Sequence, residues 1–323
     1  MGPLYDVVSL GELLIDFTPY GKSAEGRELL ETNPGGGPPN MLSMVSMLGG
    51  KTAFVGKVGD DHYGHFLEET VRSRGIDTRG VLFDKSVFTT LAFVHLTDQG
   101  DRSFSFARKP GADILLRQDE VDWDILRRAR IFHYSTVSMT EEPIRGTVKR
   151  AVQTAREAGA LVSFDPNYRP FLWGDVAEAK AEMEYGISHC DILKISGEEL
   201  ELATGVSDVA AGVDHLFSRF SNLRIVFATL GRDGCYYRMG DVRDRQPTFT
   251  RVKTIDTTGA GDTFLGCCLC RIAEAGSLNP DKKTLDEIVY FASAAASLIT
   301  TRRGGICSVP GEDEIRSLMA EGY

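Results

Sequence analysis

The chain has 323 residues, 42% of them hydrophobic and 25% charged, and a net charge of −10 at pH 7. This length and composition are typical of a globular protein with a large core. The acidic balance disfavours nonspecific binding to nucleic acid or to an anionic membrane, no apolar run approaches a membrane span, and the six cysteines are too few for a disulfide scaffold. We therefore expect a cytoplasmic protein without a secretory signal.

Short β-rich runs alternate with segments of helical period along the chain, which predicts βαβ units and a mainly parallel sheet. The strands are predicted at residues 6–10, 52–58, 131–135, 161–164, 192–195 and 225–229. The helices are predicted at 40–48, 143–158, 264–275 and 285–299. The second of these helices begins at a proline suited to a first turn and is followed by Gly159, a good residue after a helix end.

Two segments, about 17–35 and 82–110, interrupt this alternation and lack a covering helix. The second contains β-rich runs at 89–96 and 103–107, joined by the hairpin-turn sequence at 97–101. We expect these segments to form a small β-sheet that projects over a cleft as a lid. The chain contains no repeat or linker, so one domain over 1–323 with this lid is predicted.

Residues 257–262, Thr-Thr-Gly-Ala-Gly-Asp, precede an apolar helical run. The backbone N–H groups of Gly259, Ala260 and Gly261, together with the helix N-terminus, would attract the charge on a phosphoryl group in transfer. Asp262 could accept the proton of an attacking hydroxyl. A Gly-rich turn without function is a common alternative. A dinucleotide-binding loop would need a glycine where Phe264 stands, and the chain has no Gly-Lys-Ser/Thr triplet for a P-loop.

The segment does not stand alone, because three further motifs accompany it in the same order as in one family. These are Gly-Gly-Gly-Pro-Pro-Asn at 35–40, Val-Gly-Lys-Val-Gly-Asp-Asp-x-x-Gly at 55–64, and Thr-Leu-Gly-x-x-Gly at 229–234. With Asp-Thr-Thr-Gly-Ala-Gly-Asp at 256–262, the sequence resembles the ribokinase-like (PfkB) carbohydrate kinases over nearly its whole length. The resemblance implies a three-layer α/β/α sandwich and transfer of a phosphoryl group from ATP to a sugar. It also implies magnesium bound with ATP, and a possible homodimer formed through the lid.

Within this family the sequence is most similar to fructokinases, through residues 102–116 and the Phe-Asp-Pro-Asn-Tyr-Arg-Pro segment at 164–170. The expected reaction is transfer of the ATP γ-phosphoryl to the 6-hydroxyl of D-fructose. Kinases of 2-keto-3-deoxygluconate share the second segment, and Arg108 and Arg169 could bind a carboxylate, so that substrate is the alternative. A catalytically silent, sugar-sensing relative is an alternative of another class, although the retained Asp262 argues against it.

The resemblance assigns a role to each matching position. Asp262 would be the base, and Gly259, Ala260 and Gly261 the anion hole. The sugar would be bound by Asp16, Gly36, Gly37, Asn40, Phe106, Arg108 and Arg169. ATP would be bound by Lys194, Thr229, Gly231, Gly234, Ser293 and Ala295.

Two kinds of metal ion are implied by the same resemblance. Glu199 would contact magnesium through water, in a Ser-Gly-Glu-Glu segment at 196–199 where the family has N-x-x-E. A potassium site, which not all relatives need, would use Asp256, Thr258, Ile299, Arg302, Gly304 and Ser308. Cys267, Cys268 and Cys270 are expected to be buried small residues rather than metal ligands.

Overall fold

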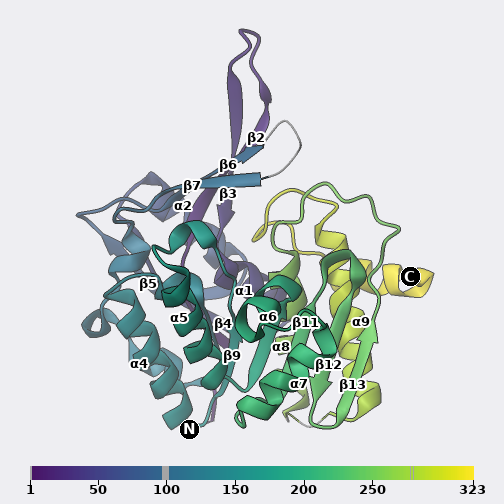
Figure 1. The fold of residues 1–323 in the computed structure, drawn as a ribbon. Coiled ribbons are helices and arrows are strands. Elements are labelled where there is room, and N and C mark those ends of the chain that lie inside the picture. Colours follow the sequence, from purple (N-terminus) through teal and green to yellow (C-terminus); the bar gives the residue numbers. More distant parts are fainter. Residues whose placement is uncertain (1, 97–101, 277, 279) are drawn as a thin grey trace.

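The computed structural model describes residues 2–96, 102–276, 278 and 280–323 (Figure 1). The predicted hairpin turn at 97–101 lies outside these residues. The strands are β1 (Tyr5–Leu10), β2 (Leu14–Lys22), β3 (Glu28–Gly35), β4 (Thr52–Gly59), β5 (Ile76–Asp84), β6 (Leu91–Leu96), β7 (Arg102–Ala107), β8 (Ala129–Ser135), β9 (Leu161–Asp165), β10 (Ile192–Ser196), β11 (Ile225–Thr229), β12 (Cys235–Met239) and β13 (Val242–Gln246). The α-helices are α1 (Gly37–Met47), α2 (His62–Ser73), α3 (Trp123–Arg127), α4 (Ile144–Glu157), α5 (Val176–Ser188), α6 (Gly197–Thr204), α7 (Val209–Arg219), α8 (Ala260–Ala275), α9 (Lys282–Ile299) and α10 (Glu312–Glu321).

In the described part of the chain, nine strands form one large sheet in the order β13-β12-β11-β10-β9-β8-β1-β4-β5. Neighbouring strands from β11 to β5 are parallel, and β12 and β13 add an antiparallel edge. Helical connections between parallel strands place helices on both faces of such a sheet. The mainly parallel sheet expected from the sequence is confirmed.

Successive strand residues face opposite sides of the sheet, which creates two separate cores. Val7 and Phe227 belong to a core that includes α1, α2, α8, α9 and α10. Their neighbours Val8 and Val226 belong to a second core that includes α3, α4, α5 and α7. The predicted α/β/α sandwich is therefore present, and α4, α5 and α7 lie on the face turned toward the viewer in Figure 1. Among the described residues, no helix is long and apolar enough to cross a membrane.

A second, four-stranded sheet has the order β3-β2-β6-β7 and lies beside one end of the large sheet (Figure 1). The pairs β2–β3 and β6–β7 are antiparallel, whereas β2 and β6 are parallel. Its second segment begins later than the predicted residue 82, because Leu82 pairs with Lys57 in the large sheet as part of β5. The hydrogen bonds of residues 82–84 to β4 explain this difference.

Candidate active site

Helix α8 begins at a glycine nest that carries an acidic side chain in its first turn. The preceding residue, Gly259, adopts a left-handed backbone with φ 75°, and no side chain caps the helix. The Asn40 amide of α1 donates to Asp262 Oδ2 at 2.9 Å. The N–H of Ala260 lies 3.3 Å from the Thr257 carbonyl oxygen, and that of Thr263 donates to the Gly259 carbonyl at 2.8 Å. The backbone of the nest thus forms a tight turn, and Asn40 of α1 holds the Asp262 carboxylate in position.

The electrostatic surroundings of Asp262 suit proton transfer near neutral pH. Burial raises the pKa of its carboxyl to about 6, and the charge of Asp165 acts in the same direction. The hydrogen bond from Asn40 and the charges of Lys194 and Arg169 oppose this increase. A carboxyl with a pKa near the working pH is ionised in a large fraction of molecules, and it is basic enough to take the proton of a substrate hydroxyl.

A second perturbed carboxyl, Asp16 of β2, shares these surroundings. Burial raises its pKa to about 7, the charge of Arg169 lowers it, and those of Asp256 and Asp262 raise it. The structure therefore brings together three predicted site residues, Asp16, Arg169 and Asp262, from segments far apart in the sequence. Two mutually repelling carboxylates beside one arginine form a polar site with positions for several hydrogen bonds.

The loop that opens α1 packs closely against this cluster. Gly36, with φ 123°, has no room for a side chain, because a Cβ atom there would lie 2.4 Å from the Glu12 carbonyl oxygen. A Cβ atom on Gly37 would lie 2.6 Å from Asn167 Nδ2 and 3.6 Å from Asp262 Oδ1. The backbone of Gly37 thus lies against the side chains of the site, and any substitution there enters it.

Arg108 and Phe106, predicted to contact a sugar, both join the small sheet to the rest of the molecule. Arg108 is only 5% exposed. Its guanidinium donates to Asp113 at 2.8 Å, to Thr140 Oγ1 at 3.1 Å and to the Val137 carbonyl at 2.9 Å. The three nitrogens of Arg108 are therefore all bound to protein oxygens. Phe106 stacks on Phe171, with ring centroids 5.5 Å apart.

Lys194 of β10 connects the nest to two further carboxylates. Its Nζ atom lies 2.9 Å from Asp165 Oδ2 and 3.1 Å from the position of a Cβ atom on Gly261. Burial opposes the charge of Lys194, but Asp165 and Glu199 raise its pKa. The two oxygens of Glu199 accept the backbone N–H groups of Tyr168 at 2.7 Å and Ser196 at 2.8 Å. Glu199 is therefore part of the cap of helix α6.

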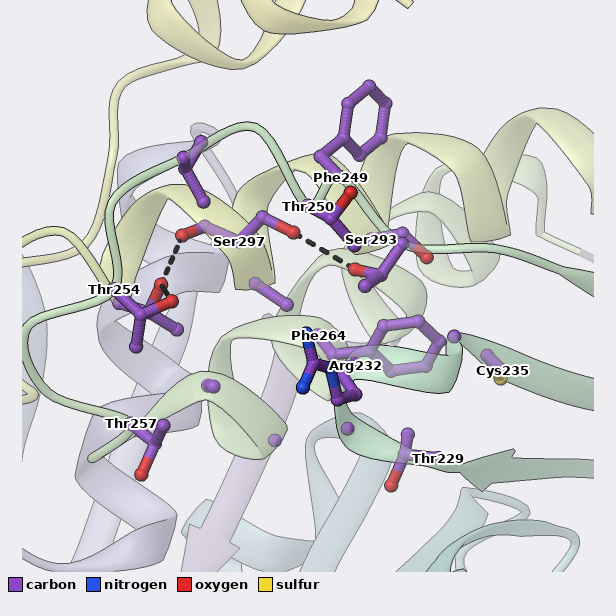
Figure 2. A pocket seen from close by; sticks show the side chains of 18 residues that line it. Thr229, Arg232, Cys235, Phe249, Thr250, Thr254, Thr257, Phe264, Ser293 and Ser297 are labelled. Carbon is purple, nitrogen blue, oxygen red and sulfur yellow. Dashed lines mark hydrogen bonds between the residues drawn. The ribbon is translucent and has the colours of Figure 1, made fainter. Parts of the chain in front are cut away.

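A cavity of about 510 Å³ lies on the other side of the α8 N-terminus. Thr229, Gly231, Gly234 and Ser293, predicted to bind ATP, line it together with Ala260 and Gly261. Figure 2 shows Ser293 and Ser297 of α9 across the cavity from Thr229 and Thr257.

Ala295, also predicted to bind ATP, lies in the core with no exposed surface. Ala296, Ser297 and Thr300 line the cavity with Ser293 instead. Residues three, four and seven positions apart share one side of a helix, whereas Ala295 is directed away from it. The sequence correctly predicted a helix here, but the prediction of Ala295 on the side that faces the cavity was wrong.

The model of the family described as pfkB family carbohydrate kinase matches residues 5–311. The chain belongs to this family. Fructokinase-1 of Zea mays is 43% identical over 316 residues, which cover 97% of each protein. A fructokinase structure from Xylella fastidiosa with bound ATP is 31% identical, with a TM-score of 0.87 over 98% of this chain and 99% of that one. A fructokinase structure from Vibrio cholerae O395 with fructose, ADP and calcium is 30% identical, with a TM-score of 0.86 over 97% and 98% of the two chains.

In this carbohydrate kinase, the loop after α9 packs against the residues that precede the nest. Asp256 Oδ1 accepts the N–H of Thr258 at 2.9 Å, and Asp256 Oδ2 lies 3.4 Å from the N–H of Gly304. The Ile299 carbonyl accepts the N–H of Arg302 at 3.1 Å, and the Ser308 N–H donates to the Gly305 carbonyl at 3.0 Å. The six residues predicted to hold potassium therefore lie on two neighbouring segments. The Arg302 guanidinium itself is bound to Glu314.

The same loop contacts the small sheet of the kinase. Arg303 Nη1 donates to the Pro19 carbonyl at 3.2 Å and lies 3.8 Å from Glu31 Oε2. A Cβ atom on Gly304 would lie 3.1 Å from Asn33 Oδ1. The loop after α9 thus contacts both strands of the β2–β3 hairpin.

Several residues around the kinase site were not predicted from the sequence. Asp165 is the ion-pair partner of Lys194, Asn167 has a positive φ of 47° beside Gly37, and Glu12 accepts the Gly37 N–H at 2.9 Å. Asp165 and Asn167 fall within the quoted 164–170 segment, so a signal for them was present. Glu12 follows a predicted strand end, where an acid commonly caps a turn, and nothing local distinguishes it.

Proposed function

We propose that this chain is an ATP-dependent fructokinase, which transfers the γ-phosphoryl group of ATP to the 6-hydroxyl of D-fructose. The observation that carries the proposal is the position of Asp262. It lies at the N-terminus of α8 beside Asn40 and the Gly37 loop, while Ala260 and Gly261 of the same turn line the cavity of about 510 Å³. One carboxyl is thus placed between a polar cluster and a cavity large enough for a nucleotide. The fructose and ADP held by the Vibrio cholerae relative support the same pair of substrates.

In the proposed reaction Asp262 removes the proton of the 6-hydroxyl, whose oxygen attacks the γ-phosphorus of ATP. The bond from the γ-phosphorus to the bridging oxygen breaks, ADP leaves, and the proton remains on Asp262. The backbone N–H groups of Gly259 and Gly261 and the positive end of the α8 dipole stabilise the charge on the transferring group, whereas the Ala260 N–H donates to the Thr257 carbonyl and fixes the turn. Lys194, held by Asp165, adds a positive charge beside Gly261.

The sugar is proposed to lie against Asp16, Asn40 and Arg169, with the backbone of Gly36 and Gly37 at close approach. Carboxylate, amide and guanidinium groups together bind sugar hydroxyls as acceptors and donors. Phe106, stacked on Phe171, would cover the sugar from the small sheet. We propose that Arg108 acts indirectly, by fastening the end of β7, because its nitrogens are bound to protein oxygens.

The nucleotide enters as its magnesium complex, since ATP reactions use the metal to neutralise phosphate charge. Thr229, Gly231, Gly234 and Ser293 line the cavity proposed for ATP. Glu199 would contact the metal through water, because each of its oxygens already accepts a backbone N–H. Potassium would be held between residues 256–258 and 299–308, which Asp256 draws together. It would supply a fixed positive charge behind the nest.

A second copy of the chain is proposed as a partner at the small sheet. Three apolar side chains of β2 and β3 are exposed there, Tyr20 at 63%, Leu29 at 43% and Leu30 at 40%. Light scattering after gel filtration should report a dimer that Leu29→Glu with Leu30→Glu converts to a monomer, while Val176→Glu, at an exposed residue that begins α5, leaves the dimer intact. A reducing compartment such as the cytoplasm is proposed, because all six cysteines are free thiols.

The decisive measurement is ADP release by the purified chain, followed with a coupled assay. Fructose, 2-keto-3-deoxygluconate, ribose and adenosine would be compared at equal concentrations with ATP and magnesium. A kcat/KM for fructose well above the others supports the proposal. A preference for the keto acid would reassign the substrate, and the absence of ADP release with all four would remove the proposed activity.

A further inference from the structure

Glu12 is a buried carboxyl beside the proposed sugar site that none of the assigned roles uses. It lies between β1 and β2, and its side chain is only 3% exposed. Its Oε1 atom accepts the N–H of Gly37 at 2.9 Å, and the Ser138 hydroxyl lies 3.4 Å from its Oε2 atom. The main chain of Glu12 also contacts this loop, because its carbonyl oxygen lies 2.4 Å from the position of a Cβ atom on Gly36.

The surroundings of Glu12 make its presence costly. Burial raises its pKa to about 7, and the charge of Asp113 adds to this increase. Hydrogen bonds from backbone N–H groups and the charge of Arg108 only partly compensate. Among the described residues no cation forms an ion pair with Glu12, and Arg108 is instead paired with Asp113 at 2.6 Å. An apolar side chain would avoid this cost but would leave the Gly37 N–H without its acceptor, so what the buried carboxyl supplies here is that hydrogen bond.

Glu12 holds in place a glycine that lies beside the proposed base. The Cβ position of Gly37 lies 3.4 Å from Glu12 Oε1, 2.6 Å from Asn167 Nδ2 and 3.6 Å from Asp262 Oδ1. Gly37 is also the first residue of α1, the helix from which Asn40 reaches Asp262. A shift of the Gly37 backbone would therefore move the sugar loop and the residue that binds the proposed base.

We propose that Glu12 is a positioning residue for the sugar: through the Gly37 N–H and with the support of Ser138, it sets the distance between the Gly36–Gly37 loop and Asp262. This inference rests on the proposed function. Glu12 acts on the acceptor and not on the nucleotide, because its hydrogen-bond partners, Gly37 at the start of α1 and Ser138 in the 136–139 turn, do not line the ATP cavity.

The test compares Glu12→Asp, which shortens the side chain, with Glu12→Gln, which removes its charge. Aspartate keeps the carboxyl but is one methylene too short to reach Gly37, whereas glutamine keeps the length and an acceptor oxygen. We expect Glu12→Asp to raise the fructose KM about tenfold, the size of effect of losing a hydrogen bond to a charged group. Glu12→Gln should remain within about threefold of the wild type, and the ATP KM should stay unchanged in both.

The matched control is Glu182→Gln, another buried carboxyl, which is paired with Lys149 at 2.9 Å on the opposite helical layer. It should lower the midpoint of thermal unfolding and leave the fructose KM unchanged. The inference is overturned if Glu12→Asp leaves the fructose KM unchanged, or if the fructose and ATP KM values rise together. It is also overturned if Glu12→Gln is the more impaired variant. A wild-type chain that does not phosphorylate fructose would instead refute the proposed function, so the two failures are distinguishable.

Discussion

The two sides of the α8 N-terminus carry different kinds of side chain. The cavity side is lined by small and hydroxyl-bearing residues of β11, α8 and α9, such as Thr229, Ser293 and Ser297. The opposite side gathers carboxyls with raised pKa values, Asp16 and Asp262 beside Arg169, and Glu12 near Arg108. A cavity with hydroxyls suits binding through shape and neutral hydrogen bonds, whereas clustered carboxyls suit orientation and proton transfer. Substitutions on the two sides should therefore affect different kinetic constants, and Asp262 should affect the chemical step itself.

The largest effect is expected from Asp262→Asn. Turnover should fall by about 10²–10⁴-fold because the base is lost. Since burial raises the pKa of folded Asp262 from 3.8 to about 6, its charge destabilises the fold at pH 7, and the amide should raise the free energy of unfolding by on the order of 1 kcal/mol. Coupled ADP release and chemical denaturation measure the two effects, with exposed Asp241→Asn as the control. Normal turnover of Asp262→Asn would refute its assignment as the base.

Gly37→Ala should have the next largest effect, confined to the sugar side. The added methyl would lie 2.6 Å from Asn167 Nδ2 and displace the loop. We expect kcat/KM for fructose to fall about 10- to 100-fold, as misplacement of a reacting group costs, while ATP binding by calorimetry is unchanged. Gly174→Ala is the control, because no atom lies within 4 Å of its Cβ position. An equal loss in both variants, or weakened ATP binding, would contradict the separation of the two sides.

Ala296→Leu tests the cavity side. The longer side chain would enter the space that Ala296 lines, so we expect the KM for ATP to rise about tenfold and the KM for fructose to stay constant. Lys283→Leu, at the exposed start of α9, should change neither constant. A rise in the fructose KM alone would place the nucleotide elsewhere.

The pH dependence sharpens the role of the carboxyl cluster. Asp262 must be ionised to accept a proton, so kcat/KM should fall as the pH decreases through about 6. The hydrogen bond from Asn40 lowers this pKa, and Asn40→Ala should therefore move the acidic limb of the pH profile to higher pH. The coupling enzymes are kept in excess at each pH. A limb that moves to lower pH would show that Asn40 does not stabilise the ionised form.

The smallest effect is expected at the contact between the small sheet and the loop after α9. Arg303→Ala removes the contacts to Pro19 and Glu31, which are partly exposed and therefore weak. We expect the KM for fructose to rise about two- to fivefold, with no change in stability beyond that of Arg316→Ala on α10. An altered KM for ATP alone would indicate that the loop after α9 acts on the nucleotide and not through the small sheet.

Much of the fold was predictable because the central strands are apolar on both faces. The six strands predicted from the sequence correspond to β1, β4, β8, β9, β10 and β11. The antiparallel edge was missed, since β13 reads Val-Arg-Asp-Arg-Gln and its side chains are mostly exposed. Helices α5, α6 and α7 were not predicted individually. Helix α1 begins three residues before its predicted start, because Pro38 and Pro39 occupy its first turn.

The parts of the candidate site that depend on backbone conformation were predictable from the sequence. The parts that depend on contacts between distant side chains were less so. The glycines of the nest and of the Gly36–Gly37 loop are visible as motifs. The role of Arg108 depends on Asp113, Val137 and Thr140, and no local pattern shows that these residues surround it. Ala295 and Ala296 lie on different sides of α9, and an alanine-rich sequence does not show which side faces the cavity.

The buried cysteines have a practical consequence for chemical labelling. Five of the six thiols, three of them within α8, are buried, and only Cys307 is exposed. Burial raises the pKa of Cys267 and Cys268, which keeps them in the unreactive thiol form. A thiol-directed dye should therefore attach to native protein at Cys307, in the loop between Arg303 and α10. A fluorophore there would report on that loop during turnover without any substitution of the chain.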